Sequence, residues 1–261
     1  MKKKIFLAGL IACMLFVLCG CTQTVEDTKM TLDLNGIGER EGVYTGEVKE
    51  ELPNGEGKFI TENEEGVEWY YEGSWVNGQM EGTGCQVWDE LGQKHEGNYK
   101  DSHYEGKGKW YENDVLIYEG NFVNDLYDGK GKLLNANGDT VYEGKFKAGV
   151  PTNQDAVRNS AKSVSFDDLA RDEMAYYGDI VSVSGEIIQV LEGEDGYAEY
   201  RLALNDDWSD VVFLSYQRPE GEVRIIEGDV ITIYGISTGL YTYESTSGAD
   251  ITVPYVNMLC R

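Results

Sequence analysis

Five glycines recur at nearly constant intervals, and they constrain the fold of this chain more than any other feature. They lie 27, 24, 23 and 24 residues apart, and each follows a ring side chain by two positions. After the first four, further glycines come nine and eleven residues later. A fixed period of this length predicts a stack of similar units, each packed on its neighbours. The pairs are Tyr44 and Gly46, Tyr71 and Gly73, His95 and Gly97, Tyr118 and Gly120, Tyr142 and Gly144.

Each unit has the pattern of a two-stranded hairpin. Residues 71–76 alternate and are rich in aromatic side chains, Asn77-Gly78 suits a tight left-handed turn, and residues 82–88 return. Asp101-Ser102, Asn124-Asp125 and Ala148-Gly149 hold the later turn positions. Because one hairpin is marginally stable in water, the hairpins are expected to stack. The repeated rings Trp75, Tyr99, Phe122 and Phe146 should then form a ladder on one face, with glycine where a ring crosses the backbone.

The pattern Tyr-Glu-Gly-x-aromatic, followed by Gly-x-Gly, resembles the MORN repeat. It is seen in residues 71–88, 95–110 and 118–133, and the resemblance covers about 42–150. His95 stands where the family usually has Tyr, the first unit carries an insertion at 50–53, and the fifth is half a unit. The resemblance implies an elongated all-β ribbon that docks proteins or self-associates, with no shared enzymatic activity.

The N-terminal residues have the pattern of an export signal. Lys2-Lys3-Lys4 precedes an apolar run over 5–18, which is short for a membrane span. The run ends in Leu18-Cys19-Gly20-Cys21, which resembles a bacterial lipobox. That resemblance implies removal of residues 1–20, acylation of Cys21 and a cell-membrane anchor on the extracytoplasmic face. The alternative is an uncleaved hydrophobic anchor. The polar segment 21–41 is expected to be a flexible tether.

Charge and cysteine content limit the classes of partner. A formal charge of −25 disfavours nucleic acid and anionic lipid headgroups, since binding of both begins with Lys and Arg. Cationic partners, divalent metals and neutral glycans remain compatible with it. Cys85 and Cys260 fall in different domains and are expected to be separate thiols, although they could pair in an oxidising compartment. No Cys or His cluster has metal-ligand spacing, so no metal or cofactor is expected.

The glycine register stops after Gly149, and a second domain is expected at 164–261, after a linker or frayed helix at 151–163. Ser165 is a suitable N-cap for a helix over 166–175, with Gly178 as its stop. Five strand-like runs follow at 179–191, 197–205, 209–216, 229–236 and 250–259. One helix and five strands predict a small OB-like barrel. Residues 165–171, 177–187, 228–235 and 239–243 resemble OB-type domains of Gram-positive surface lipoproteins, which have no assigned reaction.

The fold class expected from the sequence is therefore all-β, a stack of MORN hairpins followed by a five-stranded barrel with one preceding helix. The leading functional hypothesis is a lipid-anchored binding or scaffold protein whose ribbon docks a protein or self-associates. The alternative is cell-wall glycan binding through Trp-rich hairpins, including Trp69. A wall hydrolase in the barrel is a third class, disfavoured because neither histidine, His95 or His103, has a triad partner nearby. The candidate ligand contacts are Trp75, Trp88, Trp110, Tyr200, Tyr216, Tyr241 and Tyr243.

Overall fold

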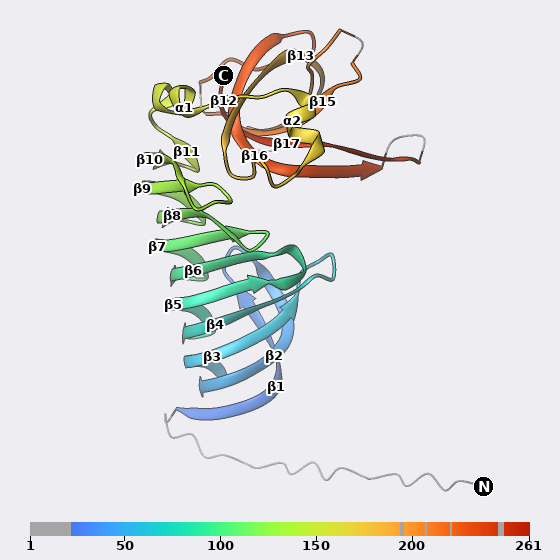
Figure 1. Cartoon of the computed structure of the whole chain (residues 1–261). Coiled ribbons are helices and arrows are strands. Elements are labelled where there is room, and N and C mark those ends of the chain that lie inside the picture. The colour runs from blue at the N-terminus through green and yellow to red at the C-terminus, as the bar shows by residue number, and fades with distance from the viewer. Residues whose placement is uncertain (1–21, 194–195, 207, 220, 245–247) are drawn as a thin grey trace, which may run out of the picture.

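The protein is built almost entirely from β-strands in two sheets. The computed structural model describes residues 22–193, 196–206, 208–219, 221–244 and 248–261. Figure 1 shows a long ribbon of strands that rises from β1 to β11, with a second module at its far end. No helix in these ranges is long and apolar enough to cross a membrane. The predicted signal peptide and the lipidation site Cys21 lie outside the described residues.

The ribbon is one antiparallel sheet of eleven strands in which every strand pairs with the next in sequence. This order is what stacked hairpins produce, and it confirms the hairpin repeat. A single turn of 3₁₀ helix, η1, spans Asp89–Leu91. The strands are β1 (Gln23–Leu34), β2 (Gly38–Lys49), β3 (Leu52–Glu62), β4 (Glu68–Val76), β5 (Gln79–Trp88), β6 (Gln93–Lys100), β7 (His103–Glu112), β8 (Val115–Val123), β9 (Leu126–Leu134), β10 (Thr140–Lys147) and β11 (Val150–Pro151).

The hairpin turns have the left-handed backbone that their sequences predict. Asn77 and Gly78 have φ of 49° and 80°, and the later turns share this geometry. Two consecutive residues with positive φ match the right-handed twist of the flanking strands, as in type I′ turns. Turns of this kind fix the register of each hairpin, so the same side chains recur on the same face in every unit.

One face of the ribbon, here called the inner face, carries the repeated rings. Tyr44, Tyr71, His95, Tyr118 and Tyr142 are all buried on it, and so are the four rings of the predicted ladder. Neighbouring rings pack edge to face, for example Tyr71 and Trp75 with centroids 5.0 Å apart. The glycines pair across strands beneath these rings, as Gly73 does with Gly84. A Cβ on Gly84 would lie 2.3 Å from the Tyr71 ring, so close approach explains the glycine.

The predicted tether at 21–41 is wrong for the residues that the structure describes. Residues 23–34 form β1, and β2 begins at Gly38. Met30, Leu32 and Leu34 alternate with polar residues, and the last two are buried against the inner-face core. The tip of this hairpin reaches β5, where the Gln79 side chain accepts from the Asn35 N–H at 2.9 Å and donates to the Asp33 carbonyl at 2.7 Å. The first hairpin therefore covers the N-terminal half of the inner face.

The second module is a six-stranded sheet that partly closes into a ring. The strand order is β12-β13-β14-β15-β17-β16, and β13 also pairs with β16. The five predicted strands are present, although β16 runs on well past its predicted end, through a bulge between Ser237 and Leu240. The elements are α1 (Gln154–Ser160), β12 (Lys162–Ser163), α2 (Phe166–Arg171), β13 (Ile180–Glu192), β14 (Tyr197–Ala203), β15 (Val211–Gln217), β16 (Val230–Glu244) and β17 (Asp250–Cys260).

The helices differ from the prediction in number and length. Instead of a single helix, the described residues of this module contain two, because the predicted linker 151–163 contains α1 and the short strand β12. The predicted N-cap Ser165 is confirmed at the start of α2, where it forms a capping box with Asp168. However, α2 ends at Arg171 and does not reach Gly178. The Asp172 carboxylate accepts the Met174 N–H at 3.0 Å, and this local bond competes with further helix.

The two sheets share a hydrophobic core. Tyr118, Phe122 and Phe146 of the ribbon pack in one cluster with Val157, Ile180, Ile236 and Leu259 of the second module. Buried polar contacts add to it, since the Asn135 amide donates to the Asp179 carboxylate at 3.0 Å. The half repeat at Tyr142 thus packs directly against the second module. The only strand of the ribbon beyond β10 is the two-residue β11.

Candidate functional site

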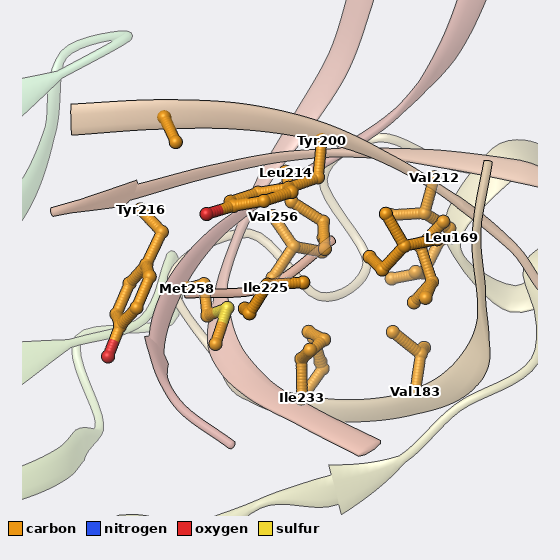
Figure 2. Packing of buried hydrophobic residues seen from close by; sticks show 14 residues of the cluster. Leu169, Val183, Tyr200, Val212, Leu214, Tyr216, Ile225, Ile233, Val256 and Met258 are labelled. Atoms are coloured by element: carbon orange, nitrogen blue, oxygen red, sulfur yellow. The ribbon is translucent and has the colours of Figure 1, made fainter. Parts of the chain in front are cut away.

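Three of the seven predicted ligand contacts are wrong, because their side chains are buried. Trp75, Tyr200 and Tyr216 are each only 1% exposed. The Trp75 indole N–H donates to the Gly57 carbonyl at 3.0 Å, inside the ribbon core. Figure 2 shows the rings of Tyr200 and Tyr216 inside the core of the second module. Strand alternation in the sequence indicates which residues share a face, but it does not identify the face that another element covers.

The other four predicted contacts remain at least partly accessible. Trp88 and Trp110 are half-buried, and their ring planes meet at 62°, so they form no flat platform. Trp69 of the glycan hypothesis is buried. On the second module, Tyr241 and Tyr243 lie side by side with planes 24° apart at the end of β16. The Arg201 guanidinium lies 4.2 Å from the Tyr243 ring centre.

Both histidines take part in contacts that hold the ribbon together. His95 is completely buried, stacked on Tyr104 with ring centroids 3.8 Å apart. Burial lowers the pKa of its imidazole to about 3, so the ring is neutral. His103 pairs through Nδ1 with Asp125, which also accepts the Tyr104 backbone N–H. Within the described ranges, no group of three or more His, Cys, Asp or Glu side chains could hold a metal ion.

The opposite face of the ribbon, here called the outer face, carries a ladder of charged side chains. Glu96 faces Lys109, Lys109 faces Glu119, Glu119 faces Lys132, and Lys132 faces Glu143 across successive strands. Opposite charges in such cross-strand positions stabilise a sheet. The alternation is broken on β5, where Cys85 stands between Glu72 and Glu96. Burial, with the negative charge of Glu96 second, raises the pKa of this thiol.

Beside the ladder runs a row of lysines without acidic partners. Lys107, Lys130 and Lys145 are exposed, and within the described chain none forms an ion pair. Lys130 and Lys145 are directly opposite each other on β9 and β10, a like-charge pair that destabilises a sheet. The ladder and this row flank a groove of about 990 Å³, floored by the paired glycines of β5 to β10. A like-charge pair that lowers the stability of the sheet is typical of a functional surface.

The charge of the ribbon changes sign along its length. Strands β1 to β4 contain ten Asp and Glu against four Lys and Arg, whereas β6 to β10 contain eight Lys against six Asp and Glu. A second groove crosses β1 to β4, lined by Asp27, Glu56 and Glu72 with Lys58. The acidic and basic halves of the outer face thus meet near β5. Composition alone hides this division, because the whole chain is strongly acidic.

Comparison with known families identifies the repeat. Residues 44–63, 71–90 and 118–140 match the MORN repeat model. The chain therefore contains MORN repeats, which are protein- and membrane-interaction modules. The unit that begins at His95 lies between the matched segments, and its ring is the one that departs from the usual Tyr. No curated protein matches this chain.

Proposed function

We propose that this chain is a non-catalytic, lipid-anchored scaffold protein on the extracytoplasmic face of a bacterial membrane, and that it self-associates through the outer face of its ribbon. The observation that carries this proposal is the unneutralised lysine row Lys107, Lys130 and Lys145 on a ribbon whose other half is acidic. Burial of the repeated rings argues against their use as the docking surface, and burial of His95 argues against catalysis there.

Charge complementarity favours a twofold pair of ribbons that run in opposite directions. The acidic half of each copy then faces the basic half of the other. The two contacts are identical, as an isologous dimer requires. Ten strands about 4.8 Å apart give a face of about 43 Å, and a width of about 16 Å yields roughly 700 Å² per copy. That area lies near the lower end for stable interfaces, so salt should weaken the pair.

Anchoring at Cys21 is compatible with this arrangement. Because β1 begins at Gln23, a lipid on Cys21 would hold the N-terminal end of the ribbon at the membrane surface with no long spacer. Two antiparallel ribbons could both be anchored if they lie along the membrane, with the twofold axis perpendicular to it. Strand addition at the β1 edge is less favourable, since that edge would be next to the anchor.

The test is a charge reversal with a compensating partner. Changing Lys130 and Lys145 to Glu in the full chain should weaken dimerisation at least tenfold in sedimentation velocity at low salt, because like charges then face each other. Mixing with a Glu56→Lys, Glu72→Lys chain should restore a mixed dimer. Reversing Arg171 and Arg224, which lie on the second module, is the matched control. If the Lys130→Glu, Lys145→Glu chain dimerised as tightly as the parent chain, the proposal would be wrong.

Cys85 offers an independent check in native membranes. It lies on β5, where the two halves of the outer face meet, so the twofold axis brings the two thiols together. A short bis-maleimide should give a product of twice the chain mass, and Cys85→Ser should abolish it. Cross-linking to other proteins only would instead assign the groove to a different protein partner.

In this proposal the second module is an OB-type barrel. The parallel pairing of β15 with β17, together with the closing pair β13 and β16, supports that assignment.

A second candidate function, glycan binding, is favoured by the partly exposed rings of Tyr241 and Tyr243 on this module. Changing both to Ala should then release the full chain from purified cell wall in co-sedimentation. Equal retention of the variant and the parent chain would exclude these rings as the platform.

A further inference from the structure

A cavity of about 310 Å³ lies between the inner face of the ribbon and the second module. The ribbon contributes Trp110, Phe122, Tyr127 and Leu133, and the second module contributes Ile236 and Met258. Mostly apolar walls with few polar groups are typical of small-molecule sites, and this volume is at the lower end of their range. Over the N-terminal repeats, the first hairpin (β1 and β2) covers the inner face. The cavity lies on the part of the inner face that this hairpin does not reach.

A comparison of two successive repeats shows an unpartnered donor at this cavity. Tyr104 on β7 and Tyr127 on β9 hold equivalent positions, 23 residues apart. Tyr104 stacks on His95 and Tyr127 stacks on Tyr118, with ring centroids 3.8 and 3.7 Å apart. The Tyr104 hydroxyl donates to Gln86 at 3.0 Å. The Tyr127 hydroxyl has no hydrogen-bond partner in the part of the chain that the structure describes.

The missing partner follows from one change between the repeats. Gln86 faces His95 across β5 and β6, and Trp110 faces Tyr118 in the equivalent place across β7 and β8. An indole offers no acceptor to a tyrosine hydroxyl. Burial raises the pKa of Tyr127 well above its usual value, so the hydroxyl keeps its proton. The half-buried Tyr127 lines the cavity, so its hydroxyl can donate a hydrogen bond to an acceptor on a ligand bound there.

We propose that this cavity binds a small, neutral, largely apolar molecule with an oxygen acceptor that receives the Tyr127 hydroxyl. A cavity of about 150 Å³ lined by apolar side chains holds benzene, so this one has room for about two fused rings. Asp125 at the cavity disfavours an anionic ligand, and its two oxygens already bind the His103 ring and the Tyr104 N–H. The flanking aromatic rings favour a flat ligand.

The test uses a matched pair of probes, 2-acetylnaphthalene and 2-ethylnaphthalene, which differ in the carbonyl oxygen. Binding to the full chain is followed by quenching of tryptophan fluorescence and by the shift in unfolding temperature. The ketone should bind about tenfold more tightly than the hydrocarbon, because only the ketone accepts a hydrogen bond. Equal affinities, or no binding of either probe up to its solubility, would overturn the proposal.

Two variants connect the binding to the cavity. Tyr127→Phe keeps the walls and removes the donor, so the two probes should bind within a factor of two of each other. Leu126→Trp, at a cavity-lining position that is 50% exposed, should block entry and abolish binding of both. Val76→Trp, at the equivalent turn position two repeats away and 49% exposed, is the control that should bind normally. If Tyr127→Phe retained the tenfold preference, the hydroxyl would not be the contact and the assignment would be wrong. Probe binding in this cavity does not depend on the proposed dimerisation through the outer face.

Discussion

Gly84→Ala should destabilise the ribbon by about 3 kcal/mol, through a clash in the core and a lost hydrogen bond. The added Cβ would lie 2.3 Å from the hydroxyl oxygen and from a ring carbon of Tyr71. That ring can move aside only by breaking the 3.0 Å hydrogen bond from its hydroxyl to the Ser74 carbonyl and by disturbing its packing against Trp75 and Tyr99. Urea unfolding followed by tryptophan fluorescence measures the loss.

Two controls separate the clash from the general cost of replacing glycine. Gly138 has a φ of 80°, and a Cβ added to it would have nothing within 4 Å, so Gly138→Ala should cost only about 1 kcal/mol, for backbone strain. In a Tyr71→Leu background the ring is gone, and Gly84→Ala should then cost less than about 1 kcal/mol. A full 3 kcal/mol loss in that background would show that Gly84 is required for some other reason.

The sequence predicts those parts of the fold that depend on local repetition. Glycine spacing and turn dipeptides such as Asn77-Gly78 determine the strand register, and that register is observed in every hairpin. The tether prediction failed because residues 22–41 lack aromatic side chains, although Met30, Leu32 and Leu34 alternate as in a strand. Their burial depends on the tip of the first hairpin reaching Gln79, a contact between residues more than 40 positions apart.

The candidate sites were less predictable than the fold. Trp75 and Tyr216 were reasonable contacts as aromatic residues on strands, but long-range packing decides that both are buried. The lysine row is visible in the sequence only once the strand register is known, because Lys130 and Lys145 become neighbours through the pairing of β9 with β10. The cavity at Tyr127 depends on how the second module packs against the ribbon, for which the sequence contains no local pattern.

His95→Tyr should both stabilise the protein and remove much of its sensitivity to mild acid. At this position the other repeats have a Tyr whose hydroxyl donates to the carbonyl three residues later, as Tyr118 does to Asn121 at 2.9 Å. The His95 ring nitrogens are buried and have no hydrogen-bond partner among the described residues. Gly97 and Gly108 beneath the ring leave the space that a tyrosine uses in the other units. At pH 8 the substitution should gain about 1 kcal/mol from a bond to the Asn98 carbonyl.

The pH dependence follows from the lowered pKa of His95, about 3 against an ordinary 6.5. Between these values the unfolded chain binds a proton that the folded chain does not, so stability is complete above pH 6.5 and falls as pH decreases. The slope is at most about 1.4 kcal/mol per pH unit. The carboxyl groups with lowered pKa, such as Glu96, lose most of their contribution below pH 4.5, the ordinary pKa of Glu. Urea unfolding between pH 6.5 and 4.5 therefore reports mainly on His95.

Over that interval the parent chain should lose about 2 to 3 kcal/mol, and the His95→Tyr chain should lose little. His95→Phe distinguishes the two effects, because it removes the titrating group without supplying a hydroxyl. It should match His95→Tyr in its flat pH profile and fall below it by about 1 kcal/mol at pH 8. Tyr118→Phe, which removes the equivalent bond in the next repeat, should cost a similar amount at every pH. If the parent and the His95→Tyr chain lost stability in parallel, protonation of this buried ring would not be the cause of the acid sensitivity.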